Sequence, residues 1–339
     1  MAKAVGLLSG GLDSMLAVRL VQDQGVEVHA IHFVSVFNCG ARAGKRLAAR
    51  LAAEALECPL KIVDFTGEQL EIIRNPSHGY GHAANPCIDC HMAMIRRAAD
   101  YVREIGADFI VTGEVVGQRP MSQRNFVLKM IDNESGLEGL VLRPLSARQL
   151  PETRAEKEGL VDRDKLEGIM GRTRSRQMEL AGRFGLSGYP TPAGGCLLTD
   201  RGFGVRVIDL VRHGQLTVND AHLTKVGRHY RFDDTTKVIV GRNQRENGVI
   251  ETFAREGDVL LVPADIPGPT ALLRGDTSAA NTERAASLCA RSSKEKDSAR
   301  ARVLVRLART LDKGRIIEVA PSDDDSAASL AVADRKEAT

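Results

Sequence analysis

The feature that most constrains the fold is an alternation of short apolar runs and amphipathic stretches in the first third of the chain. The apolar runs predict buried strands at Ala4–Leu8, Val26–Val34, Leu60–Phe65 and Asp108–Thr112. The stretches between them predict helices over Asp13–Gln24, Ala41–Glu57, Glu68–Ile73 and Cys87–Ile105. Strands separated by helices of this length form right-handed βαβ units. The sequence therefore predicts an α/β fold with a doubly wound parallel sheet.

The second half of the chain has a looser pattern. Helices are predicted over Pro151–Gly171 and Thr173–Phe184, and the Gly- and Pro-rich stretch GLSGYPTPAGGC predicts a loop. From Gly202 onward the runs VRVIDLV, KVIVGR and DVLLVP favour strands, and Glu283–Ala290 and Ser298–Thr310 favour helices. This mixture predicts a smaller C-terminal α+β domain.

The predicted domain boundaries follow these changes in pattern. We expect an α/β domain over residues 1–175 and a cysteine-bearing linker over residues 176–200. The α+β domain would span residues 201–320, and an acidic tail of small polar residues, 321–339, would be disordered.

Composition limits the class of protein. The 339 residues are 43% hydrophobic, enough for two cores, and contain no apolar run long enough to cross a membrane. No signal-peptide pattern is present, so we expect a cytoplasmic protein with its six cysteines reduced. Residues 201–320 carry 21 Lys/Arg against 15 Asp/Glu, which is compatible with a nucleic-acid partner. The absence of Trp counts against a base-stacking platform.

The hexapeptide SGGLDS, Ser9–Ser14, lies between the first predicted strand and the first predicted helix. Its two glycines let successive backbone N–H groups turn toward an anion, and the helix start adds its positive end. No Gly-Lys-Ser/Thr follows, so the loop is not a Walker A loop. On local chemistry alone, ordinary helix N-capping by Ser or Asp is an equal alternative.

As a whole, the hexapeptide resembles the PP-loop, S-G-G-x-D-S, of the N-type ATP pyrophosphatases. The resemblance implies cleavage of ATP into AMP and pyrophosphate. By position it implies that the phosphates are bound by Ser9, Gly10, Gly11, Asp13 and Ser14. It also implies that Asp13 is a catalytic residue that helps to place Mg²⁺.

Two further segments narrow the resemblance. VTGEVVGQRPMSQ, residues 111–123, is similar to a segment of the tRNA 4-thiouridine synthetases, which implies that Gly113, Glu114 and Gln118 face the nucleotide. The likeness covers roughly residues 1–200, but no THUMP or rhodanese segment is recognisable. HLTKVGRHYRF, KVIVGRNQREN and GPTALLRG resemble the RNA-binding domain of NFACT proteins, and a generic basic α+β domain is the alternative.

The stretch NPCIDCH places Cys87 and Cys90 on one face of a helix start, where the backbone N–H groups are expected to lower a thiol pKa. Haem attachment does not fit a chain without an export signal. Zinc would need a remote fourth ligand such as His78 or His82. A redox pair would leave Cys196, in PAGGCLL, unexplained. Cys39, Cys58 and Cys289 are expected to be small buried hydrophobic residues.

Resemblance to tRNA thiolation enzymes implies a role for three of the cysteines. Cys87, Cys90 and Cys196 would hold a 4Fe–4S cluster, with zinc as the weaker alternative. In the other scheme known for such enzymes, one cysteine carries a persulfide that a second resolves, and Cys87 and Cys196 are the thiols expected to react. The sequence assigns no role to His91.

Together these features predict an ATP-dependent tRNA thiouridine synthetase. Its partners would be tRNA and a sulfur donor, either a cysteine desulfurase or sulfide, while homodimer formation is left open. Two alternatives remain: sulfur or nitrogen transfer to a small molecule, and a non-catalytic RNA- or metal-binding protein.

Overall fold

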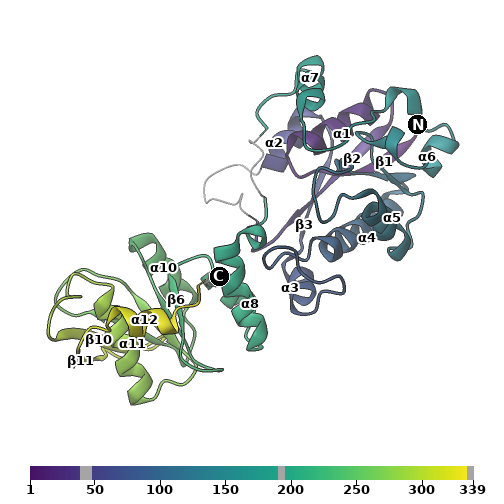
Figure 1. Ribbon diagram of the computed structural model, residues 1–339. Helices are drawn as coiled ribbons and strands as arrows, with labels where there is room; N and C mark the ends of the chain where they lie inside the picture. The colour runs from purple at the N-terminus through teal and green to yellow at the C-terminus, as the bar shows by residue number, and fades with distance from the viewer. Residues whose placement is uncertain (39–47, 190–194, 334–339) are drawn as a thin grey trace. The chain divides into compact units, whose positions relative to one another are not determined.

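The computed structural model describes residues 1–38, 48–189 and 195–333 (Figure 1). The chain divides into two compact units. The N-terminal unit comprises residues 1–81 and 85–197, and the C-terminal unit comprises residues 82–84 and those from 198 onward. Within the described ranges, no helix has the length and apolar character needed to cross a membrane.

The N-terminal unit is built on a five-stranded sheet in the order β3-β2-β1-β4-β5, and every pair of neighbours is parallel. The predicted doubly wound parallel sheet is therefore confirmed. Its strands are β1 (Lys3–Leu7), β2 (Glu27–Val34), β3 (Leu60–Asp64), β4 (Phe109–Val111) and β5 (Val141–Leu142). Its helices are α1 (Leu12–Gln22), α2 (Ala48–Ala55), α3 (Thr66–Arg74), α4 (Cys87–Ile105), α5 (Asn125–Glu134), α6 (Arg154–Lys157) and α7 (Ser175–Arg183).

Strand side chains alternate between two apolar cores, one on each face of this sheet. Ala4 and Phe109 pack into the core that α1 and α7 cover. Their chain neighbours Val5 and Ile110 pack into the opposite core, which α4 and α5 cover. Burial on both faces explains the uninterrupted apolar runs of the central strands β1, over residues 4–7, and β4.

The long helix predicted over Pro151–Gly171 is wrong. Only α6 and a 3₁₀ turn at Arg163–Lys165 are helical there. A capping box between Thr153 and Glu156 starts α6, and Gly159 follows with a left-handed φ of 70°, which stops the helix.

The C-terminal unit contains a six-stranded antiparallel sheet in the order β11-β10-β8-β9-β7-β6. The predicted smaller α+β domain is confirmed. Its strands are β6 (Arg228–Arg231), β7 (Lys237–Val240), β8 (Val259–Pro263), β9 (Ala271–Arg274), β10 (Ala301–Leu307) and β11 (Arg315–Val319). Its helices are α8 (Arg201–Arg212), α9 (Val218–Leu223), α10 (Gln244–Phe253), α11 (Ala279–Arg291) and α12 (Asp324–Leu330).

Three predictions fail in this unit. The run VRVIDLV lies in α8 and is not a strand, because Phe203, Val207 and Leu210 are buried at helical spacing. The helix predicted over Ser298–Thr310 is instead β10, which pairs with both β8 and β11. Within the tail predicted to be disordered, residues 324–330 form α12, which Asp323 caps and whose Ala327 is buried against the core, and residues 334–339 lie outside the described ranges.

Candidate functional site

The crevice at the switch point of the parallel sheet brings two predicted segments together. The chain runs from β1 to β2 on one side of β1, and β4 pairs with its other side. In sheets of this kind, ligands bind outside the carboxyl ends of the strands at this point. Ser9–Gly11 follows β1, and Thr112–Gly113 follows β4.

The loop after β1 has the geometry of an anion site. Gly10 has a φ of 82°, and a Cβ there would lie 2.5 Å from the carbonyl carbon of Ala48. Ser9 and Ser14 pair their hydroxyls at 3.1 Å, and Ser14 donates to the Gly11 carbonyl at 2.8 Å. The N-cap of α1 is Gly11, and no side chain caps it. The alternative of ordinary capping by Ser or Asp is therefore wrong for this helix.

Gly113 packs directly on the first turn of α1. A Cβ at Gly113 would lie 2.6 Å from both N and Cα of Ser14, so only glycine fits this approach. Gln118 reaches back to the same turn and donates from Nε2 to Asp13 Oδ2 at 2.8 Å. The structure thus brings together Asp13, Ser14, Gly113 and Gln118, as the sequence predicts.

Two polar residues at the start of α7 were missed by sequence reasoning. Arg174 precedes this helix and places Nη2 3.7 Å from Asp13 Oδ1. Gln177, fully buried in α7, has no hydrogen-bond partner for either amide atom. The sequence signal was RTRSRQ, three arginines at a helix start, where the helix dipole disfavours cations that have no other use.

Several buried atoms around the loop lack partners. Asp13 Oδ1, Gln118 Oε1 and Arg174 Nε make no hydrogen bond within the described chain. Each such atom costs on the order of 1–3 kcal/mol when it stays unpaired. A site that is this incompletely bonded is suited to a polar ligand that completes it.

Glu114 differs from the other predicted nucleotide residues because the chain itself occupies its carboxylate. Oε1 accepts from His91 Nδ1 at 2.9 Å, and Oε2 accepts from Thr112 Oγ1 at 3.1 Å and Arg143 Nε at 2.9 Å. Burial alone would raise the pKa of Glu114, but the charge of Arg143 and the bond from His91 outweigh it and hold the pKa at about 2. These contacts fit a residue that holds the site together.

The three predicted thiols belong to the N-terminal unit, and two of them share one turn of a helix. Cys87 and Cys90 lie in the first turn of α4, where Asn85 Nδ2 donates to Cys87 Sγ at 3.1 Å. Burial raises the pKa of the Cys90 thiol well above its usual range, and the charges of Cys196 and Cys87 raise it further. The expected lowering of thiol pKa at the helix start is therefore wrong for Cys90, because this thiol is buried among Gln69 and apolar neighbours.

The thiols are not arranged as a metal centre in the described residues, which contain no group of three or more His, Cys, Asp or Glu side chains able to hold a metal ion. Neither predicted extra zinc ligand joins them: His78 binds Asp89, and His82 belongs to the C-terminal unit. The ligand set Cys87, Cys90 and Cys196 stays a prediction.

The remaining cysteines behave as small apolar residues where the structure describes them. Burial raises the pKa of Cys58 to about 11 and that of Cys289 to about 12. Cys39 lies outside the described residues.

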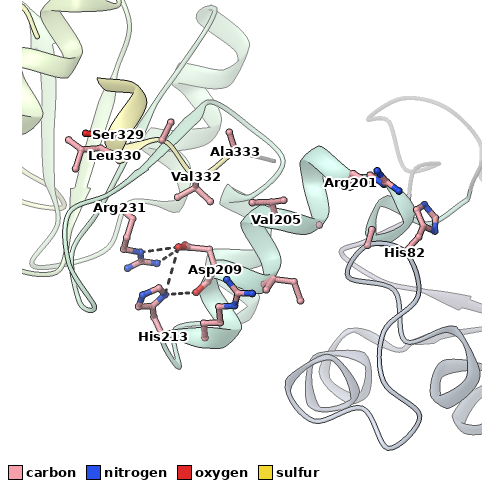
Figure 2. Close-up of a pocket in the computed structure, with 15 residues that line it drawn as sticks. His82, Arg201, Val205, Asp209, His213, Arg231, Ser329, Leu330, Val332 and Ala333 are labelled. Carbon is pink, nitrogen blue, oxygen red and sulfur yellow. Dashed lines mark hydrogen bonds and ion pairs between the residues drawn. The ribbon is translucent and has the colours of Figure 1, made fainter. Parts of the chain in front are cut away.

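The C-terminal unit has a pocket of its own, with a volume of about 540 Å³ (Figure 2). Asp209 of α8 accepts from Arg231 at 2.6 Å and from the buried Lys237 at 2.7 Å, so its charge is neutralised. Arg201 and Arg212, at the two ends of α8, also line the pocket, and neither pairs with any residue in the described part of the chain. The lining thus offers two uncommitted guanidinium groups to an anionic ligand.

Comparison with known proteins follows the same division. Residues 1–153 match the family model described as thiamine biosynthesis protein (ThiI), and residues 227–330 match the NFACT protein RNA-binding domain. A probable tRNA sulfurtransferase of Acetivibrio thermocellus is 40% identical over 119 residues, 34% of this chain and 29% of the relative. A tRNA-specific 2-thiouridylase MnmA of Desulfosudis oleivorans is 34% identical over 111 residues, 32% of this chain and 30% of the relative. The chain thus spans about three tenths of the length of these relatives.

Two solved structures are similar over parts of the chain. A 4-thiouridine synthetase, solved in complex with RNA and bound ATP, is 23% identical with a TM-score of 0.35 and covers 55% of this chain and 52% of its own. The C-terminal part of a fibronectin/fibrinogen-binding protein from Streptococcus suis is 14% identical with a TM-score of 0.29 and covers 72% of this chain and 98% of its own.

The fold and the loop define the N-terminal unit as an α/β nucleotide-binding domain of the PP-loop type. More particularly, residues 1–153 belong to the ThiI family, and residues 227–330 form a domain of the NFACT RNA-binding type. The resemblances predicted from SGGLDS, from the segment after β4 and from the basic C-terminal segments are confirmed.

Proposed function

We propose that the protein is an ATP-dependent tRNA sulfurtransferase that adenylates a uracil carbonyl oxygen and replaces it with sulfur. One arrangement carries the proposal: an anion-binding loop at a sheet switch point lies in the same compact unit as three thiols, two of which fall within the residues that match the ThiI model. The NFACT-type domain supports RNA as the partner.

ATP would bind with its phosphates on the loop Ser9–Ser14. The uncapped N–H groups of α1 and the positive end of the helix attract the phosphate charge. Arg174 adds a cation beside Asp13. Asp13 Oδ1 is a buried oxygen with no hydrogen bond, which suits it to hold Mg²⁺. When bound, Mg²⁺ neutralises charge on the departing pyrophosphate.

The first step joins the uracil to the nucleotide. The uracil carbonyl oxygen attacks the α-phosphorus of ATP, the bond to the bridging oxygen breaks, and pyrophosphate leaves. The loop stabilises the charge that develops on pyrophosphate. The adenylated oxygen then leaves readily as AMP.

The second step delivers sulfur. The terminal sulfur of a persulfide on Cys87 or Cys196, loaded by a cysteine desulfurase, attacks the activated carbon, and the carbon–oxygen bond breaks to release AMP. The other thiol then attacks the cysteine sulfur, so the S–S bond breaks and thiouridine is released. The resulting disulfide is reduced by an external thiol before the next cycle. Cys90 is less suited to carry the persulfide because it is buried.

A 4Fe–4S cluster on Cys87, Cys90 and Cys196 remains part of the proposal as a separate hypothesis, through which no step above is routed. It is tested by iron and sulfide content after anaerobic purification. A cluster predicts a brown protein whose iron content collapses in Cys87→Ala. A colourless protein without iron contradicts the cluster hypothesis and leaves the persulfide scheme.

We assign tRNA binding in part to the pocket along α8. Its two uncommitted guanidinium groups are eleven residues apart, or roughly 16 Å along the helix, enough to contact separate phosphates. Helix α8 lies outside residues 227–330, so Arg201 and Arg212 would add to the contacts of the NFACT-type domain.

Nucleoside analysis of tRNA from a deletion strain tests the proposed function. The proposal predicts loss of one thiouridine and its return when the wild-type chain is restored, but not when Asp13→Ala is supplied. An unchanged thiouridine content would refute the proposal.

A small-molecule acceptor is the second candidate, because the family model that matches residues 1–153 is described as a thiamine biosynthesis protein. In that case tRNA thiouridine would be unchanged, and the deletion strain would need a sulfur-containing small molecule for growth. A non-catalytic RNA- or metal-binding protein would form no AMP from ATP.

A further inference from the structure

His91, which has no role in the chemistry above, links the cysteine-bearing helix to the nucleotide segment. It directly follows Cys90 in the first turn of α4, and its Nδ1 lies 2.9 Å from Glu114 Oε1. Glu114 comes three residues after β4 ends, 23 residues further along the chain. The contact therefore joins two elements that the sequence separates.

The Glu114 end of this link is rigid. Glu114 is 6% exposed, and its carboxylate also accepts from Thr112 and Arg143. Arg143 is itself held by Asp132 through two bonds of 2.7 and 2.8 Å. A buried carboxylate with three donors has little freedom to follow His91, so His91 is the group that is held in place.

Glu114 is also connected to the phosphate loop through the residue that precedes it. Its neighbour Gly113 lies against the backbone of Ser14 so closely that a Cβ would come within 2.6 Å. Gly113 and Glu114 thus connect the loop to His91, which directly follows Cys90 in the chain. In the same helical turn, Asp89 accepts from His78 Nδ1 at 2.9 Å. This bond holds the segment between α3 and α4 against the start of α4.

We infer that His91 is a positioning residue that sets the thiols of Cys87 and Cys90 at a fixed distance from the bound nucleotide. This inference rests on the proposed function and deepens it. His91 does not touch the reacting atoms. His91 keeps the thiols where they can deliver sulfur to the adenylated base. A displacement of the thiol by about 1 Å would slow sulfur transfer on the order of a hundredfold.

The first test compares three variants. His91→Leu removes the donor, His91→Asn keeps an amide donor near the position of Nδ1, and His29→Leu removes a His–Glu pair (His29 to Glu27, 2.7 Å) elsewhere in the same unit. AMP and thiouridine are measured in the same reaction with tRNA.

The inference predicts that His91→Leu forms AMP within about twofold of the wild-type rate but makes at least tenfold less thiouridine per AMP. His91→Asn should recover most of the wild-type ratio, and His29→Leu should leave it unchanged. An unchanged ratio in His91→Leu, or a parallel loss of AMP and thiouridine, would overturn the positioning role.

A second readout needs no turnover and so separates this inference from the proposed function. The rate of alkylation of Cys87 is measured with and without a non-hydrolysable ATP analogue. In the wild type and His91→Asn the analogue should change this rate, whereas in His91→Leu it should not. Equal responses in all three proteins would contradict the link, whereas a response confined to proteins that keep the donor would support it even if no thiouridine were formed.

Discussion

Two regions of the molecule treat buried polar groups in opposite ways. In the C-terminal unit, Arg274 donates to Asp258 at 2.6 Å and also binds Asp220, so its buried charge is paired. Around the loop of the N-terminal unit, Asp13 Oδ1 and Arg174 Nε are buried without hydrogen-bond partners.

This difference separates a scaffold from a reaction site. Paired charges stabilise one packed arrangement, and breaking a pair leaves the partner charge buried. Unpaired atoms lower stability until a ligand supplies the missing bonds, so they persist where binding requires them. The comparison predicts that changes in the C-terminal network alter folding, whereas changes around the loop alter nucleotide chemistry.

The largest expected effect is on the scaffold. Arg274→Leu should destabilise the C-terminal unit by about 3–5 kcal/mol, because Asp258 and Asp220 would keep uncompensated buried charge. Urea denaturation of the full chain, followed alongside ATP binding, measures this. Arg300→Leu, which breaks an exposed pair of 3.8 Å, is the control and should change stability by less than about 0.5 kcal/mol. Loss of ATP binding in folded Arg274→Leu would contradict the assignment of the C-terminal network to folding alone.

Glu114 provides a pH test of the link between β4 and α4. Its pKa is about 2 in the folded protein and near 4.5 when unfolded. Its charge therefore stabilises the fold above pH 4.5, and this contribution, about 3 kcal/mol, is lost as the pH falls toward 2. Urea unfolding between pH 5 and pH 2 should show that the wild type loses this stability and that Glu114→Gln does not.

The exposed Glu104→Gln serves as the control for this experiment and should follow the wild-type curve. Parallel pH curves for the wild type and Glu114→Gln would contradict the assignment of Glu114 as an ionised anchor.

Gly113→Ala should weaken ATP binding by roughly a hundredfold, since the added Cβ would displace the backbone of Ser14. Calorimetric titration with ATP measures the change. Gly182→Ala is the matched control, because the glycine is helical and no atom lies within 4 Å of the new Cβ. Its affinity should be unchanged and its stability equal or slightly higher. Equal ATP affinity for both variants would refute the close approach at the switch point.

The smallest expected effect is on RNA binding. Arg212→Ala should weaken tRNA binding about threefold, because one phosphate contact is lost. The slope of the logarithm of the binding constant against the logarithm of the salt concentration should become shallower by roughly one. Binding titrations at several salt concentrations measure both values. Arg103→Ala, which removes an exposed ion pair with Asp100 in the last turn of α4 in the N-terminal unit, is the control. A slope identical to wild type would exclude the α8 pocket as a phosphate contact.

Local pattern was sufficient to predict much of the N-terminal unit. The strands around Val5, Ile31 and Ile110 are apolar on both sides, as a sheet covered on both faces requires. SGGLDS and TGE follow neighbouring strands, so their meeting at the switch point could be expected. Residues whose partners are remote in sequence could not be found this way: Arg174 meets Asp13 only after α7 packs on α1.

The failures in the C-terminal unit have a related cause. Residues 298–310 are rich in Ala, Arg and Leu and favour a helix, but two flanking strands impose an extended backbone. The run VRVIDLV favours a strand by composition, but it also fits the spacing of a helix. In α8 it packs as a helix, with Phe203 and Leu210 buried on one face. Short apolar runs of this kind do not distinguish the two structures.

The most direct test of the central claim measures AMP, pyrophosphate and thiouridine in one reaction of the purified chain with ATP, Mg²⁺, tRNA and a desulfurase-loaded sulfur source. The account predicts AMP and thiouridine in equal amounts for the wild type, and neither product for Asp13→Ala, which should remain folded. ADP as the product, or AMP formed in full by Asp13→Ala, would contradict it.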